Sequence, residues 1–194
     1  MKLTNILLLG AIFMALTLGT AINSQAADNP RVVMETSMGT MVIELYPEKA
    51  PITVKNFLDY VDAGFYDGTI FHRVIPGFVI QGGGFDDNME KKENRAPIKN
   101  EADNGLRNLR ATLSMARTQD INSATSQFFI NLKNNSNLDY NGHSFGYAVF
   151  AKVVKGVGTI DKIAGVKTTT KGHYQNVPAE PVMLISAKRE VSKK

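Results

Sequence analysis

The 194-residue sequence contains no cysteine and no tryptophan. Without cysteine the chain can form no disulfide, cannot use a thiol as a nucleophile and cannot be lipidated on cysteine. Any folded domain must therefore be held together by its hydrophobic core. A chain of this length is long enough to bury such a core.

Histidine is also scarce, and the motifs of several enzyme classes are missing. The three histidines, His72, His143 and His173, show no spacing typical of a metal site. There is no Gly-x-Ser-x-Gly motif of serine hydrolases, and Gly82-Gly83-Gly84 lacks the Gly-Lys-Ser/Thr ending of a phosphate-binding loop. We therefore expect no metal, no cofactor and no covalent intermediate.

Charge of one sign is not in large excess. The net charge is +4 at neutral pH, and the basic residues are scattered apart from a short run at 188–194. Proteins that bind nucleic acid usually carry a basic stripe or patch. The sequence therefore predicts no nucleic-acid partner.

Long apolar runs are rare as well, and the clearest one lies at the N-terminus. Lys2 is followed by the apolar run Ile6–Leu18 and then by small residues that end at Ser24-Gln25-Ala26-Ala27. This order is typical of a secretory signal peptide, and the run is shorter than the ~20 residues that span a bilayer. We expect residues 1–26 to be removed as a signal peptide, leaving 27–194 as one domain without a membrane anchor. A permanent anchor is the alternative.

The first half of the domain shows two clear patterns. Strands are expected at 31–35 and 40–46, joined by a hairpin turn, because apolar residues alternate there. A helix is expected from Pro51 to a left-handed glycine at Gly64. The residues that carry these patterns are Val33, Met41, Ile43 and Leu45 in the strands and Val54, Phe57, Leu58 and Val61 in the helix.

Short strand-like runs dominate the rest. The segment 69–81 predicts two strands broken at Pro76-Gly77, and the polar segment 85–110 is expected to be either functional or disordered. Further strands are expected at 111–116, 127–132, 145–154 and 181–187, with a short helix at 157–163. Many short strands with two helices predict a barrel or a sandwich, and a barrel is favoured because closure removes exposed strand edges.

Arg73 is a charged residue within an otherwise apolar strand. Such a side chain needs a partner or a water-lined groove, or it faces solvent on the outer side of a sheet. His72 and Arg73 should point to opposite faces because side chains alternate along a strand. We expect His72 to be packed inside.

A second unusual segment joins a Ser/Thr/Gln cluster to two phenylalanines. The alternation of a strand places Gln127 and Phe129 on one face and Phe128 and Ile130 on the other. Phe128 is expected in the core, and Phe129 could be core or site. Tyr147, in a third segment, could be core or the wall of a pocket.

These segments together resemble one family. FHRVIPGFVIQGG, SMAR, SATSQFFI and FGYAVFAKVVKG are similar in order and spacing to the signature regions of cyclophilins, from about Arg31 to the C-terminus. Lys99–Leu106 resembles an insertion of the bacterial exported branch. The resemblance implies a mainly β fold, a closed eight-stranded antiparallel barrel capped by two α-helices. It also implies peptidyl-prolyl cis/trans isomerase activity in the periplasm, with secretion as the alternative.

The resemblance also implies roles for individual residues. Arg73 takes the place of the catalytic arginine, and Gln81 supports it and the substrate backbone. Backbone groups at Ala116 and Arg117 bind the residues before proline, with Gln127 beside them. The expected walls of the proline pocket are Phe78, Val79, Phe129 and Leu138, and Tyr147 stands where many eukaryotic members have histidine.

The sequence departs from the family pattern at three positions. Val79 replaces a common methionine, Ala151 replaces a usual glycine, and Asn137 stands where many members have a large aromatic residue that helps to bind cyclosporin. We therefore expect weak or no cyclosporin binding. The expected partners are proline-containing unfolded or flexible polypeptides, and the expected state is a monomer. The main alternative is a chaperone that binds proline segments without turnover, and a hydrolase is less favoured.

Overall fold

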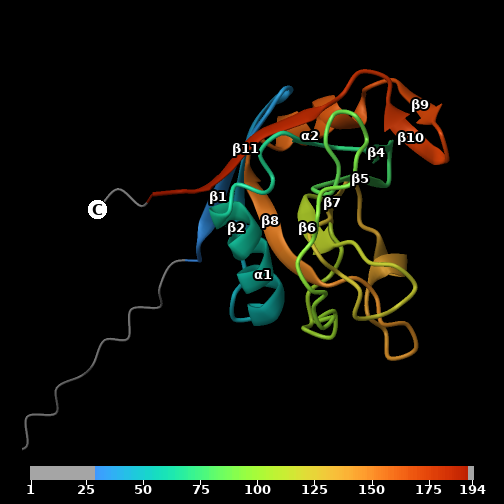
Figure 1. Ribbon diagram of the computed structural model, residues 1–194. Helices are drawn as coiled ribbons and strands as arrows, with labels where there is room; N and C mark the ends of the chain where they lie inside the picture. Colours follow the sequence, from blue (N-terminus) through green and yellow to red (C-terminus); the bar gives the residue numbers. More distant parts are fainter. Residues whose placement is uncertain (1–28, 192–194) are drawn as a thin grey trace, which may run out of the picture.

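The computed structural model describes residues 29–191 (Figure 1). The predicted signal peptide, residues 1–26, lies outside this range. The elements within it are β1 (Arg31–Thr36), β2 (Gly39–Leu45), α1 (Pro51–Asp62), β3 (Thr69–Ile70), β4 (Arg73–Ile75), β5 (Val79–Gly82), β6 (Thr112–Met115), β7 (Phe128–Asn131), the 3-10 helix η1 (Ser136–Leu138), β8 (Val149–Lys155), α2 (Val157–Ala164), β9 (Thr168–Lys171), β10 (Tyr174–Pro178) and β11 (Met183–Arg189).

Nine strands form one curled antiparallel sheet in the order β3-β11-β1-β2-β8-β6-β7-β5-β4. The mainly β architecture with two α-helices is as predicted. The closed eight-stranded barrel is wrong in detail. The two edge strands, β3 and β4, are consecutive in the chain and separated only by Phe71 and His72. β3 pairs with β11 and β4 pairs with β5. The two edge strands are therefore joined by the chain at these two residues and not by strand pairing.

The hairpin of β1 and β2 shows which face of the sheet is buried. Met34 lies opposite Met41 and Val32 lies opposite Ile43, and all four side chains are fully buried. Val33, which we expected on this face, is only partly buried. The prediction chose the wrong face of β1. Met41 and Ile43 of β2 face the core, and the register places Val32 and Met34, rather than Val33, opposite them.

Helix α1 follows the sequence pattern closely. Proline lies in its first turn, its apolar stripe is buried and Gly64 after its end has φ of +62°. The ring of Phe57 contacts Tyr66, Phe128 and Phe150 at centroid distances of 5.0–5.9 Å. α1 therefore closes one side of the curled sheet, against β8 and β11 (Figure 1).

Helix α2 packs on the other side, against β2, β4 and β5, and buries Thr159, Ile160 and Ile163. The sequence predicted it within one residue. Neither helix of residues 29–191 has the length and apolar character needed to cross a bilayer.

The polar segment 85–110 is irregular and is tied to α1 by side chains. Glu101 accepts hydrogen bonds from the backbone N–H groups of Ile52 and Thr53, at 3.1 and 2.8 Å, and so caps the helix. The backbone N–H of Arg95 donates to the hydroxyl of Tyr60 at 2.8 Å. The segment therefore secures both the first and the last turn of α1.

The sequence analysis missed the two-stranded sheet of β9 and β10. Its signal was present, since Thr168–Lys171 is rich in β-branched threonine and Gly172, with φ of +59°, provides the turn. The hairpin projects from the sheet near β4 (Figure 1). This placement gives it a position beside the candidate site.

Candidate active site

One cavity, which we call the Arg73 cavity, collects nine of the ten residues predicted for the site. Its volume is about 140 Å³. A cavity of about 150 Å³ can hold a benzene ring, so this one is large enough for a five-membered ring. It is lined by Arg73, Phe78, Val79, Gln81, Ala116, Arg117, Phe129, Leu138 and Tyr147.

Arg73 is positioned by the pairing of β4 with β5, which places it opposite Gln81. Its Nη1 donates to Gln81 Oε1 at 3.2 Å, and Gln81 Nε2 donates to Gln127 Oε1 at 3.0 Å. This chain of amides places Gln127, the tenth predicted residue, beside the cavity. Within residues 29–191 the guanidinium forms no ion pair with a carboxylate. Its remaining donors are therefore free to act on a bound molecule.

His72 is packed inside, as expected. Its side chain is 5% exposed, while the next residue, Arg73, reaches the cavity. Burial, together with the charge of Arg73, lowers the pKa of His72 to about 4. The imidazole is therefore neutral near pH 7 and adds no charge to the site.

One apolar wall of the cavity comes from β7. Phe129 lies opposite Gln81 and Ser114 in the sheet and lines the cavity, and its ring meets that of Tyr147 edge-on at 5.5 Å. Phe128 points the other way and is fully buried among core rings. The strand pattern had predicted this division. The sequence had left Phe129 and Tyr147 undecided between core and site, and both line the cavity.

Arg117 is held against the rim rather than extending into solvent. Its Nε donates to the carbonyl of Gly146 at 3.0 Å, and its guanidinium carbon lies 4.7 Å from the centroid of the Tyr147 ring. Gly146 has φ of +56°, and a Cβ there would lie 2.5 Å from the backbone nitrogen of Tyr140. Only glycine fits this turn, which delivers Tyr147 to the cavity.

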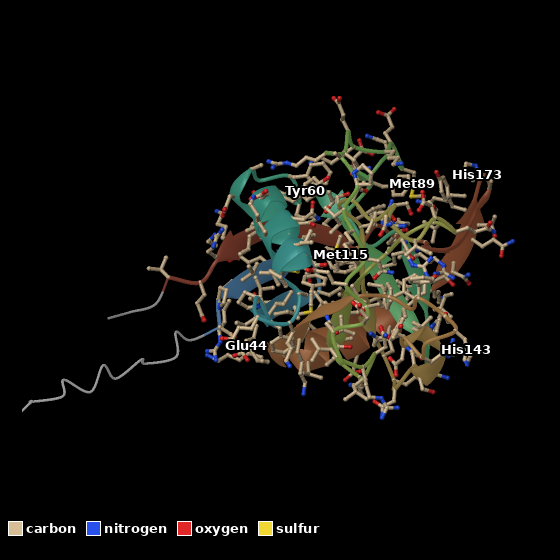
Figure 2. The ribbon with its side chains drawn as sticks, turned by 90° about the horizontal axis from the view of Figure 1, so that it is seen from below. Glu44, Tyr60, Met89, Met115, His143 and His173 are labelled. Carbon is tan, nitrogen blue, oxygen red and sulfur yellow. The ribbon has the colours of Figure 1, made fainter. Side chains whose placement is uncertain are left out.

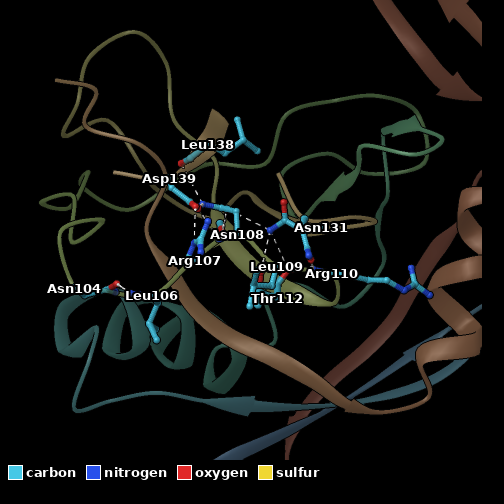
Figure 3. Close-up of polar contacts among 12 residues, drawn as sticks. Asn104, Leu106, Arg107, Asn108, Leu109, Arg110, Thr112, Asn131, Leu138 and Asp139 are labelled. Carbon is cyan, nitrogen blue, oxygen red and sulfur yellow. Dashed lines mark hydrogen bonds and ion pairs between the residues drawn. The ribbon is translucent and has the colours of Figure 1, made fainter. Parts of the chain in front are cut away.

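A buried polar network holds the Leu138 wall in place (Figure 3). Asn108, only 1% exposed, donates from Nδ2 to Asp139 Oδ1 at 2.9 Å and to the carbonyl of Leu138 at 3.1 Å. Its Oδ1 accepts from Ser114 Oγ at 2.7 Å and from Asn131 Nδ2 at 3.2 Å. One side chain thus joins β6, β7 and η1.

Asn135 extends the network to a second wall. Its Nδ2 donates to the carbonyl of Phe78 at 3.0 Å and to Asn131 Oδ1 at 2.8 Å. The sequence analysis missed these asparagines. The signal that could have found them is Asn131, a polar residue with no exposed surface inside a predicted apolar strand.

The geometry defines a cavity with apolar walls and two guanidinium groups at its edge, those of Arg73 and Arg117. Within residues 29–191 no three His, Asp or Glu side chains come together in a way that could hold a metal ion. The chemistry available from these residues is therefore binding of an apolar ring together with hydrogen-bond donation.

Comparison with known proteins identifies the class of protein. Residues 31–189 match the model of the family described as cyclophilin type peptidyl-prolyl cis-trans isomerase/CLD. The chain belongs to this family of enzymes. Both the predicted family and the predicted isomerase activity are thereby confirmed.

Particular relatives cover nearly the whole described chain. Peptidyl-prolyl cis-trans isomerase A of Dickeya dadantii is 58% identical over 163 residues, covering 84% of this chain and 86% of the relative. Peptidyl-prolyl cis-trans isomerase B of Escherichia coli is 55% identical over 158 residues, covering 81% of this chain and 96% of the relative.

A solved structure confirms the fold. A cyclophilin type peptidyl-prolyl cis-trans isomerase of Cryptosporidium parvum, crystallised in the presence of the dipeptide Ala-Pro, superimposes with a TM-score of 0.73 at 26% identity. The similarity covers 84% of this chain and 99% of that one.

Proposed function

We propose that the chain accelerates rotation about X-Pro bonds in exported proteins, with Arg73 as the catalytic residue. The observation that carries this assignment is a guanidinium with unused donors at the edge of an apolar cavity of ring size. The crystal structure of the Cryptosporidium protein, obtained in the presence of the dipeptide Ala-Pro, supports proline-containing polypeptides as the substrate class.

Rotation about the X-Pro bond is slow because amide resonance creates a barrier of about 20 kcal/mol. The enzyme need only bind the twisted amide better than the two planar forms. In the twisted amide the nitrogen lone pair is no longer delocalised and becomes a better hydrogen-bond acceptor. Arg73 is suited to donate to it because a guanidinium is always charged and carries rigidly placed donors.

One hydrogen bond cannot supply the whole effect. A hundred-thousandfold acceleration corresponds to about 7 kcal/mol, and a charge-assisted hydrogen bond contributes about 1.5–3 kcal/mol. The remainder comes from holding the proline ring still while the preceding carbonyl rotates. Phe78, Val79, Phe129 and Leu138 supply the apolar grip, and Tyr147 closes its side.

The chain before the proline needs an anchor of its own. We assign this to backbone groups at Ala116 and Arg117, with Gln127 beside them. Gln81 orients Arg73 through the 3.2 Å hydrogen bond and also contacts the substrate backbone. Fixing both sides of the bond leaves rotation of the peptide unit as the free motion.

Proline-limited refolding of a model protein tests this proposal. Wild type should remove the slow refolding phase, and Arg73→Ala should lose most of this activity while keeping its fold. Near-normal activity of Arg73→Ala would remove Arg73 from the mechanism. Equal improvement of refolding yield by both proteins, without a change in rate, would favour a binding chaperone instead.

The compartment follows from the predicted signal peptide, and we propose the periplasm. The basic start, apolar run and small-residue end of residues 1–26 support export. Cell fractionation followed by mass spectrometry should find a periplasmic protein that begins at Ala27. A cytoplasmic protein that retains residues 1–26 would contradict the proposal.

Weak cyclosporin binding is a further part of the proposal. Asn137 is exposed on η1, next to the cavity wall Leu138, where many family members have a large aromatic residue. Cyclosporin should inhibit wild type poorly, and Asn137→Trp should be inhibited at lower concentration. Strong inhibition of wild type would show that the aromatic residue is not needed.

A further inference from the structure

Three hollows of the surface meet at Gln81, which lines all of them. The first is the Arg73 cavity. The second, of about 460 Å³, lies beside the β9–β10 hairpin, whose Tyr174 is part of its lining. The third, of about 200 Å³, shares Ala116 and Arg117 with the Arg73 cavity. We call the three hollows together the Gln81 cleft. Because they share lining residues, the residues that flank a proline bound in the cavity lie close to the other two hollows.

The charged side chains of the Gln81 cleft are all of one sign. Among the described residues that line it, those of the types Lys, Arg, Asp and Glu are Arg73, Lys91 and Arg117. None of these three forms an ion pair with a carboxylate of the part of the chain that the structure describes. The cleft therefore carries three positive charges that no carboxylate in its lining neutralises.

The neighbouring surface is different, because it does contain carboxylates. A fourth hollow, of about 340 Å³, is lined by Asp103 and Asp139 together with Arg107, and Arg107 Nε lies 3.3 Å from Asp139 Oδ2. Glu90 and Glu93 lie close to Lys91 in the sequence but line none of the hollows of the cleft. The excess of positive charge is therefore a local property of the cleft.

Lys91 reaches the cleft from the polar segment that precedes β6. Its backbone forms an isolated β-bridge with Phe85, whereas its side chain is exposed and forms no hydrogen bond with the described residues. Figure 2 shows Met89, two residues before Lys91, on the same side of the molecule as His173, which lines the cleft. The ammonium group of Lys91 is therefore available to pair with a bound carboxylate.

We propose that the Gln81 cleft selects proline segments that carry Asp or Glu close to the proline, with Lys91 as a specificity-determining residue. The inference rests on the proposed function and narrows its substrate class. A carboxylate of the bound polypeptide is attracted by the three cations, and a basic side chain is repelled by them. Repulsion contributes as much as attraction does, because specificity is a difference between two affinities.

Isomerisation of blocked peptides tests this proposal. Each peptide contains one proline and carries Glu, Gln or Lys either two residues before it or two residues after it, so that this side chain is the only possible charge. At about 0.01 M ionic strength, wild type should prefer Glu over Gln in kcat/KM by roughly twofold to fivefold in at least one of the two sets, the effect of an exposed ion pair. Lys should rank below Gln in the same set. At about 1 M ionic strength the Debye length is only about 3 Å, and the ranking should disappear.

A charge reversal locates the preference in the cleft. Lys91→Glu changes an exposed side chain and should lower the ratio of kcat/KM for Glu over Gln by at least about twofold. The matched control is Lys188→Glu on β11, which changes the net charge by the same amount at an exposed position outside the three hollows. This control should leave the ratio unchanged. Urea unfolding of both variants checks that they remain folded.

The outcomes separate this inference from the proposed function. No acceleration of any peptide would refute the proposed function and the inference with it. Acceleration of every peptide, with equal kcat/KM for Glu and Gln in both sets, would refute the charge selection alone. A preference for Glu that persists at high ionic strength, or that Lys188→Glu lowers as much as Lys91→Glu does, would also overturn the inference, because the cations of the cleft would then not be its cause.

Discussion

Replacing Asn108 with alanine should destabilise the protein more than any exposed substitution. The change removes four side-chain hydrogen bonds, to Asp139, Leu138, Ser114 and Asn131, from a side chain that is 1% exposed. Leu138 keeps its hydrogen bond from the Tyr147 N–H at 2.9 Å. The loss is therefore smaller than four separate bonds would suggest.

The partners decide the magnitude. Asp139 Oδ1 keeps the backbone N–H of Asn108 at 2.6 Å, and Asn131 Nδ2 keeps Thr112 Oγ1 at 3.0 Å. The fully buried hydroxyl of Ser114 loses its acceptor, which costs about 1–3 kcal/mol, and the lost bond to a charged group adds about 1.5–3 kcal/mol. We expect a total loss of about 3 kcal/mol.

Urea unfolding measures this loss. With an m-value of about 2 kcal/mol/M, the midpoint should fall by about 1.5 M. The control Asn88→Ala, at an exposed site, should change stability by less than about 0.5 kcal/mol. Because Leu138 lines the Arg73 cavity, Asn108→Ala should also raise KM. If the urea midpoint of Asn108→Ala lies within about 0.5 M of that of wild type, the assigned role of the network is refuted.

Other substitutions test separate features. The pKa of His72 is lowered to about 4, so the unfolded state binds the proton more readily than the folded state. The free energy of unfolding should therefore fall between pH 6.5 and pH 4 by roughly 3 kcal/mol more in wild type than in His72→Phe. Unfolding measured across this pH range checks the difference. Gly156→Ala should lower the free energy of unfolding by more than about 2 kcal/mol, because the new Cβ would lie 2.1 Å from a backbone oxygen. Gly68→Ala, also at positive φ but in open space, should lower it by about 1 kcal/mol. Equal losses of stability on thermal unfolding would contradict this. The Asp62–Arg189 pair is exposed, and the pairing lowers the pKa of Asp62. Asp62→Asn should therefore lower the free energy of unfolding by less than about 1 kcal/mol, a contribution present above the ordinary carboxyl pKa and lost as pH falls. A larger loss, or one that persists in high salt, would contradict this.

Local patterns predicted much of the fold. The α1 stripe, its terminal glycine and the alternation around Phe128 and Phe129 are short-range signals, and the structure agrees with them. These signals follow from helix and strand periodicity, which neighbouring residues determine. The resemblance to cyclophilins then supplied what periodicity could not, namely which polar residues share one cavity.

The tertiary structure decided features that depend on residues far apart in the chain. The register of β1 against β2 put Val32 rather than Val33 in the core, and the bend at Phe71 and His72 replaced barrel closure with two edge strands. The Asn108 network joins segments separated by tens of residues. The sequence by itself determined the class of fold and the residues that line the cavity. Long-range pairing decided which side chains support that cavity, because the contacts that support it join residues that are not neighbours in the chain.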